Sequence, residues 1–216
     1  MSWGFKALEA ITLPSVTAFV TLDPIHPKGI RPTELRDYYE AAADLALPSS
    51  VPQDVRDYFD AVRMLWVHGW FYYPFYTLAT VHSGLCVEMA LRERFRLEGL
   101  TFSQRGGALK KMLEEAVHRR WLVPDGFATL RRRKESENFW AEVEADIDGE
   151  KGPPVLAANE QALRLEAGMR RLLDGIRQFR NIRAHPRGLS LRLPGMTYTE
   201  LQFVTDLIAQ LFAPAL

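Results

Sequence analysis

Apolar residues recur every three or four positions along most of this chain, which is the spacing of one buried face of a helix. The pattern predicts helices over residues 33–47, 51–66, 74–97, 108–120, 125–134, 159–184 and 197–211. Residues 1–31 lack this spacing and carry several prolines, although the run 15–22 favours a short strand. The expected fold class is therefore all-α, a helical bundle with an irregular N-terminal arm.

Residues that favour turns and caps indicate where two of these helices begin. Proline suits a first turn, so Pro74 is expected to open a helix. Thr197 and Glu200 have the spacing of a capping box, which places the start of the last helix there. We expect residues 1–50 to form the arm and the first helix, and residues 51–216 to form the helical domain.

The composition is that of an ordinary globular protein. The chain has 216 residues, 47% of them hydrophobic, which is enough to build a core. Its one cysteine, Cys86, lies in an apolar run and is expected to be a buried thiol, which excludes an internal disulfide and a cysteine-based zinc site. The histidines show no ligand spacing, so neither a metal nor a cofactor is expected. The N-terminus lacks the pattern of a signal peptide, which favours a cytoplasmic protein.

The segment from Met64 to Val87 contains no charged residue and is long enough to span a bilayer. Glycines, histidines and the dipeptide Tyr73-Pro74 interrupt it, so two core helices are expected rather than a membrane span. Residues 66–76 within it are dense in aromatic side chains. A packed core or a dimer face is the usual role of such a cluster, and stacking on unpaired bases is the alternative.

Charge is balanced overall but unevenly distributed along the chain. The formal net charge is zero, so no global field attracts nucleic acid. Two basic blocks, residues 105–134 and 161–192, flank an acidic block at 135–160. The first block contains four consecutive basic residues, Arg131, Arg132, Arg133 and Lys134. These side chains are candidates to follow an RNA backbone, and a solvated helix face explains them equally well.

The most informative stretch is Arg180-Asn181-Ile182-Arg183-Ala184-His185-Pro186. Arginine offers a permanent planar charge that suits a phosphate, and histidine transfers protons near neutral pH. On a continuous helix the side chains of Arg180 and His185 would lie about 140° apart. Pro186 disfavours the helical conformation at the residue before it, which frees His185 to turn toward Arg180. A structural salt bridge for Arg180 and a helix-capping role for His185 are the alternative.

This motif resembles the Arg-x4–6-His signature of HEPN domains, an all-helical superfamily rich in RNases. A polar residue, often asparagine, follows the arginine in many members, as Asn181 does here. The stretch from Leu85 to Phe95 resembles the earlier core helix of such domains, and the similarity extends over residues 54–214. The resemblance implies a HEPN-like helical bundle and a homodimer in which two motifs face one cleft.

The same resemblance implies a metal-independent endoribonuclease. The RNA 2′-hydroxyl would attack the adjacent phosphate and leave a 2′,3′-cyclic phosphate and a 5′-hydroxyl. His185 would transfer protons, Arg180 would hold the phosphate and its developing charge, and Asn181 would orient them. Arg183 is a supporting residue of the motif. The family implies a setting in bacterial toxin–antitoxin systems or antiviral defence, with RNA as the substrate and an antitoxin or regulatory protein as a further partner.

Glu88 lies among apolar residues of the predicted 74–97 helix, where a carboxylate needs a partner. Arg92, one turn later, is the local candidate. In families of this kind an acidic residue of the earlier helix often braces the motif arginine, which makes Arg180 the other candidate. Two alternative functions stay open: a non-catalytic HEPN-like module that binds a nucleotide or a protein, and a dimerisation protein that uses its aromatic face.

Overall fold

The computed structural model describes residues 12–14, 20–22, 30–101, 108–128, 130–132 and 193–214. Within these ranges the protein is mostly helical, which confirms the predicted class in its coarse form. The α-helices are α1 (Leu35–Ala43), α2 (Gln53–His68), α3 (Pro74–Leu97), α4 (Ala108–His118) and α7 (Pro194–Leu211). A short antiparallel pair, β1 (Val20–Leu22) and β2 (Ile30–Pro32), precedes α1.

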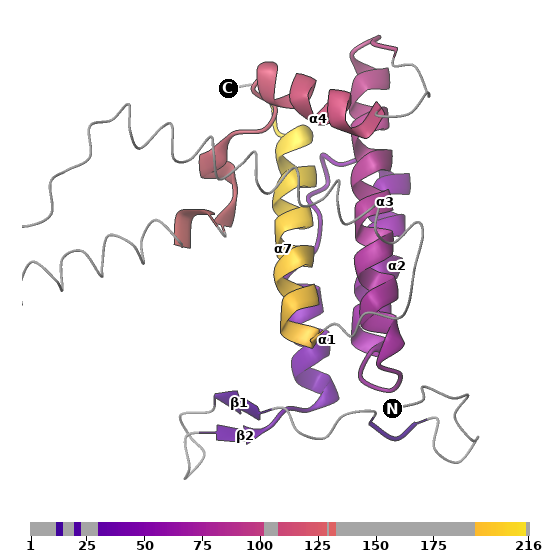
Figure 1. Ribbon diagram of the computed structural model, residues 1–216, viewed down its shortest axis with the longest axis vertical. Coiled ribbons are helices and arrows are strands. Elements are labelled where there is room, and N and C mark those ends of the chain that lie inside the picture. The colour runs from indigo at the N-terminus through magenta and orange to yellow at the C-terminus, as the bar shows by residue number, and fades with distance from the viewer. Residues whose placement is uncertain are drawn as a thin grey trace, which may run out of the picture.

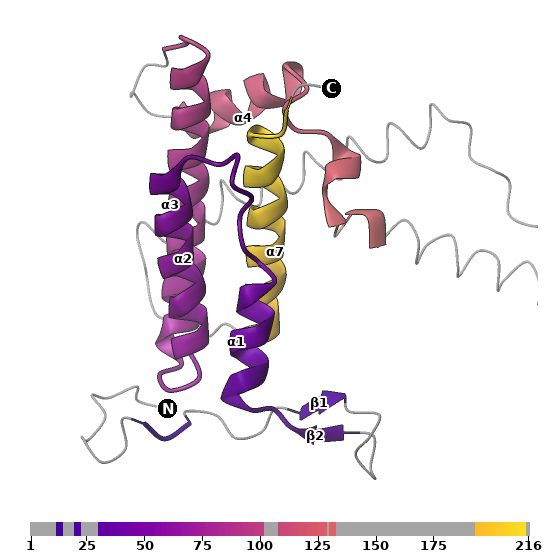
Figure 2. The same cartoon turned by 180° about the vertical axis from the view of Figure 1, so that it is seen from behind.

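The helix α3 occupies the middle of the bundle. It packs along α2 on one side and along α7 on the other, and α1 packs on α2. Figure 1 shows α3 and α7 running alongside each other, with α4 across one end and the β1–β2 pair at the opposite end. Figure 2 shows the same arrangement from behind, with α1 at the end of the bundle nearer the strands.

The apolar stripe predicted over residues 51–66 forms the buried face of α2. Val55, Phe59 and Val62 are almost fully buried, and Trp66 is 4% exposed. Burying a side chain of this size contributes about 1.5–3 kcal/mol relative to leaving it in water. This stripe therefore explains both the helical conformation of α2 and the side on which it meets its neighbours.

The helix α3 begins at Pro74 and ends at Leu97, as predicted. Proline is tolerated in the first turn because its missing N–H would have no acceptor within the helix. Beyond the helix, Gly99 has a φ of 68°, a left-handed conformation that glycine adopts readily. The chain turns between His68 and Pro74, so the uncharged segment divides between two helices. Within the described ranges, no helix combines the length and the apolar character that crossing a membrane requires.

The core lies where α3 meets α2 and α7. Its fully buried side chains include Cys86, Ala90 and Leu91 of α3 and Leu201, Leu207 and Ile208 of α7. The Cys86 thiol is free, and burial raises its pKa to about 12. A thiol with so high a pKa is a poor nucleophile, so Cys86 is a packing residue, as the sequence predicted.

The start of α7 corrects the predicted capping box. The helix begins at Pro194, with Leu193 as its N-cap, one turn before the predicted start. Thr197 lies inside the helix, and its Oγ1 donates to the Leu193 carbonyl at 3.5 Å. The predicted capping box at Thr197 and Glu200 is wrong because proline opens the helix earlier. Glu200 instead accepts a hydrogen bond from Thr80 of α3 at 3.2 Å.

The helix α1 is shorter than predicted at its C-terminal end. It begins after Glu34, close to the predicted start, but ends at Ala43. Leu45 and Leu47 are buried outside the helix. Pro48 disfavours the helical conformation of the residue before it, and burial of the two leucines stabilises the non-helical path.

The helix predicted over residues 125–134 is interrupted near its start. A 3-10 turn, η2, covers Pro124–Gly126, Phe127 has an extended conformation, and helical residues resume at 128. Phe127 is fully buried and stacks on Phe203 of α7 with 4.7 Å between ring centroids. We attribute the break to this contact, which anchors the segment to α7.

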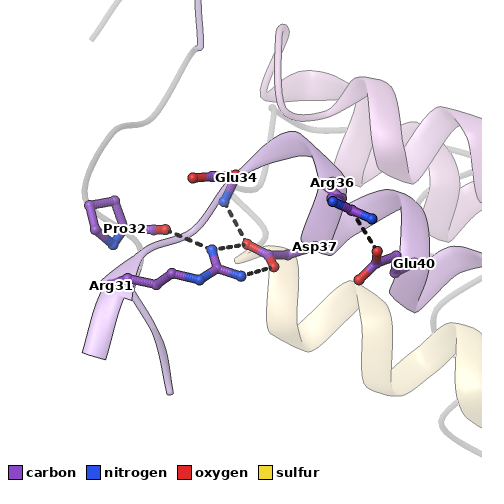
Figure 3. A network of polar contacts seen from close by, with 6 residues as sticks. All are labelled: Arg31, Pro32, Glu34, Arg36, Asp37 and Glu40. Atoms are coloured by element: carbon purple, nitrogen blue, oxygen red, sulfur yellow. Dashed lines mark hydrogen bonds and ion pairs between the residues drawn. The ribbon is translucent and has the colours of Figure 1, made fainter. Parts of the chain in front are cut away.

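A polar network joins β2 to the start of α1. Arg31 donates to both carboxylate oxygens of Asp37, at 2.8 and 2.5 Å, and the Glu34 N–H donates to Asp37 Oδ2 at 2.7 Å (Figure 3). The hydrogen bond from Arg31 lowers the pKa of Asp37 below its ordinary value. β1 lies within the predicted strand at 15–22, whereas β2 was not predicted from the sequence.

Candidate functional site

The residues of the predicted catalytic motif lie outside the described residues. These are Arg180, Asn181, Arg183 and His185. Two members of the basic run, Arg133 and Lys134, also lie outside the described residues. Their predicted roles stay predictions. The helix that follows the motif in sequence is α7, which packs along α3.

Glu88 is buried on α3, with 7% of its surface exposed. Arg92 Nη2 donates to its Oε1 at 2.6 Å, one helical turn away. The local pair, one of the two predicted alternatives, is therefore present. The predicted brace between Glu88 and Arg180 stays a prediction because Arg180 lies outside the described residues.

A cleft of about 750 Å³ lies between the first turn of α2 and the C-terminal half of α3. It is lined by Pro52, Gln53, Asp54, Val55, Leu85, Glu88, Met89, Arg92, Glu93 and Arg96. Both arginines are paired within α3, because Arg92 contacts Glu88 and Arg96 donates to Glu93 at 2.9 and 2.6 Å. Three carboxylates and two paired arginines repel a polyanion more than they attract it, so the cleft suits a protein surface better than RNA.

The described part of the basic run, Arg131 and Arg132, is exposed to solvent. Arg131 Nη1 donates to the carbonyl of Asp125, which leaves its charge accessible while it restrains the side chain. The helical residues of this segment begin at Ala128. The Ala128 N–H donates to Asp206 Oδ2 of α7 at 2.7 Å. Burial raises the pKa of Asp206, and the bond from Ala128 opposes that shift. The two arginines are therefore presented on a segment held against α7.

The aromatic residues predicted at 66–76 mainly form core. Trp66, Tyr73 and Tyr76 are buried, and Trp66 Nε1 donates to the Pro194 carbonyl at 3.0 Å. Trp66 also packs on Tyr198 and Tyr38, from helices at either end of the described sequence. Trp70, Phe71, Tyr72 and Phe75 are half-buried. The buried rings cannot stack on unpaired bases, so the core interpretation is confirmed for them.

One half-buried polar pair joins α2 to α3 and was missed in the sequence. Tyr58 Oη and His82 Nδ1 lie 2.8 Å apart. In the sequence His82 is one of the histidines that interrupt the uncharged segment and show no ligand spacing, and no role is assigned to Tyr58. The helical spacing of α2 and α3 does not mark this pair, because the two residues lie 24 positions apart in the sequence. Among the residues that the structure describes, no group of His, Cys, Asp and Glu could hold a metal ion.

The chain matches no family model, no curated protein and no solved structure. The HEPN resemblance therefore rests on the motif at Arg180–His185 and on the helical stretch that contains Glu88. Both are features of sequence, and the mostly helical bundle agrees with them at the level of fold class.

Proposed function

We propose that the protein is a metal-independent endoribonuclease. The proposal rests on one observation in the sequence. His185 follows Arg180 by five positions and directly precedes Pro186, at a predicted helix end. The two side chains supply a phosphate anchor and a proton-transfer group, which is the minimum needed to cleave RNA through its own 2′-hydroxyl. The mostly helical bundle supports the proposal because it is the class of fold in which HEPN ribonucleases occur.

In the proposed reaction the 2′-oxygen of one nucleotide attacks the phosphorus on its 3′ side. His185 removes the 2′-hydroxyl proton or donates a proton to the departing 5′-oxygen. Arg180 stabilises the negative charge that develops on the phosphate, and Asn181 orients the phosphate or the imidazole. The bond between phosphorus and the 5′-oxygen breaks, which leaves a 2′,3′-cyclic phosphate and a 5′-hydroxyl. In a homodimer one histidine would act as the base and the other as the acid.

Other residues would support binding and assembly. Arg183, within the motif, and the basic run from Arg131 to Lys134 would attract the RNA backbone. Glu88 would brace Arg180 from α3. An antitoxin or regulatory protein would act on the same dimer in a bacterial toxin–antitoxin or antiviral defence setting.

The proposal is tested with purified protein and single-stranded RNA in EDTA. We expect cleavage of RNA but not of DNA, which lacks the attacking hydroxyl. His185→Ala and Arg180→Ala should each lower the rate by about 10²–10⁴-fold. His118→Ala and Arg36→Ala change the same residue types at exposed positions and should leave the rate unchanged.

Cleavage by His185→Ala at the wild-type rate would eliminate the mechanism. The absence of cleavage by the unmutated protein across varied RNAs would favour the alternative, a non-catalytic HEPN-like module that binds a nucleotide or a protein. The cleft beside α2 favours a protein ligand in that case, because its charges are mixed and internally paired.

A further inference from the structure

The helix α3 exposes large apolar side chains on the side where it meets α2. Leu78 and Leu85 lie seven positions apart, on one side of the helix, and are 41% and 39% exposed. Met89, one turn beyond Leu85 on the same side, is half-buried. Apolar side chains that line up in this way, rather than lie scattered, are typical of a surface that binds another molecule.

This apolar row borders the cleft between α2 and α3. Asp54, Leu85 and Met89 all line the cleft, the first from α2 and the other two from α3. Beyond the cleft, Tyr58 of α2 and His82 of α3 are half-buried and joined by the 2.8 Å hydrogen bond, so the two helices stay in contact there. The α2–α3 surface, as we call it, consists of Asp54, Tyr58, Leu78, His82, Leu85 and Met89.

The residual charge of this surface is acidic. Arg92 and Arg96 are each paired with a carboxylate one turn away on α3, so that side of the cleft contributes no net charge. Asp54 is exposed and has no basic partner among the residues that the structure describes. Asp57, also exposed, accepts a hydrogen bond from the uncharged amide of Gln53. The carboxylates of α2 therefore leave negative charge beside the apolar side chains of α3.

We propose that the α2–α3 surface binds a helical segment of another protein, apolar on one side and with a lysine or arginine next to its apolar residues. Two packed helices leave a groove between them that accepts the side chains of a third. The apolar residues of the partner would cover Leu78, Leu85 and the adaptable Met89, and its cation would meet Asp54. A helix suits this surface because it satisfies its own backbone hydrogen bonds, and the described part of the surface offers no strand edge.

The same charge disfavours two other occupants. A second copy related by a two-fold axis would present the same acidic surface and bring like charges together. A phosphate backbone would meet the same repulsion. The docking site stands apart from RNA cleavage, and only its assignment to the antitoxin or regulatory protein rests on the proposed function.

The first test identifies the chemistry of the partner from a peptide library. Displayed helical peptides of about five turns have leucine fixed at every third or fourth position and random residues elsewhere, and they are selected on the full-length wild-type chain. We expect the bound peptides to be enriched in lysine and arginine next to the leucines, because these residues complement Asp54. Enrichment in acidic residues, or a selection without binders, would overturn the inference.

The second test locates the binding site of a selected peptide by fluorescence anisotropy. Leu85→Glu places a charge among the apolar residues and should raise the dissociation constant by about tenfold or more. Leu97→Glu makes the same change at a 54% exposed position of α3 that does not line the cleft, and should leave binding unchanged. Circular dichroism checks that both variants are folded. Wild-type affinity in Leu85→Glu would show that the peptide binds elsewhere and would refute the site.

The third test reverses one charge. Asp54→Lys should weaken the basic peptide by about tenfold and should bind a version in which glutamate replaces its lysine. Glu114→Lys makes the same reversal at a 62% exposed position of α4 and should affect neither peptide. Asp54 lies in the first turn of α2, where a carboxylate also stabilises the helix, so thermal unfolding is measured in parallel. An Asp54→Lys protein with lower stability but unchanged peptide affinities would show a purely structural role and contradict the charge assignment.

Two further measurements separate this inference from its rivals. If Leu85→Glu converts a wild-type dimer into monomers in light scattering, the surface is a contact between copies and the inference is wrong. Peptide binding by a protein that never cleaves RNA would refute the proposed function and leave the docking site standing. RNA cleavage by a protein that binds none of the peptides would do the reverse.

Discussion

Glu88 is held in the interior of the protein by a hydrogen bond from a solvent-exposed arginine. Arg92 donates to Glu88 Oε1 at 2.6 Å, and its side chain is 56% exposed. An ion pair with one partner in water contributes about 1 kcal/mol or less. A carboxylate accepts several hydrogen bonds, so this pair is compatible with a second role for Glu88 as the brace of Arg180.

Two substitutions separate the roles of Glu88. Glu88→Gln removes the charge from both contacts and should lower RNA cleavage by about 10- to 100-fold, because a misplaced phosphate anchor costs that much. Arg92→Gln removes only the local pair and leaves Glu88 charged, so it should lower the rate less than Glu88→Gln does. Initial rates and thermal unfolding of both variants provide the measurement. Equal rates for both variants would show that Glu88 serves Arg92 alone.

At the scale of elements, helices with a strong apolar stripe could be predicted from the sequence. The stripe from Val55 to Trp66 and the proline at 74 were sufficient to place α2 and α3. The start of α7 was missed because two signals competed, and proline at 194 prevailed over the capping spacing at 197. The break at Phe127 could not be predicted, because its cause is a stacking contact with Phe203, far away in sequence.

The junction between β2 and α1 gives a prediction for pH dependence. Its carboxylate, Asp37, has a lowered pKa, chiefly because Arg31 donates hydrogen bonds to the ionised form. A lowered pKa contributes stability that is present above the ordinary value near 3.8 and is lost as pH falls through the folded value. Asp37→Asn should therefore reduce the free energy of unfolding by about 1 kcal/mol at pH 7 and by less at an acidic pH well below 3.8.

Urea unfolding of Asp37→Asn at both pH values checks this expectation. Glu40→Gln is the matched control, because its partner Arg36 is 81% exposed and the pair should contribute little at either pH. A constant difference between Asp37→Asn and the wild type across this pH range would contradict the role assigned to the carboxylate.

At the scale of the whole molecule, the described helices form one core around α3. Because α3 packs against both α2 and α7, helices that precede the motif in sequence and the helix that follows it belong to one packed unit. The class of this bundle could be predicted from helical spacing. The hydrogen bond between Tyr58 of α2 and His82 of α3 could not, because its two residues lie 24 positions apart in the sequence.

For the candidate catalytic site, the sequence predicts the chemical roles of the residues but not their arrangement in space. The types and spacing of Arg180 and His185 indicate a phosphate anchor and a proton shuttle. Their mutual distance depends on how the chain turns at Pro186, and the proposed composite site depends on how two copies would meet. Neither is encoded in local spacing, so the assembly and the reaction need separate measurements.

The most direct test of the proposed ribonuclease uses one RNA and one changed atom. An oligoribonucleotide is incubated with the purified protein in EDTA, and the cut site is mapped. The cleavage is then repeated with a single 2′-deoxynucleotide at the 5′ side of that site. The account predicts a 2′,3′-cyclic phosphate by mass spectrometry from the unmodified RNA, and no cut at the deoxynucleotide, because the attacking hydroxyl is gone. Cleavage at the deoxynucleotide, or products with a 3′-hydroxyl and a 5′-phosphate, would contradict it.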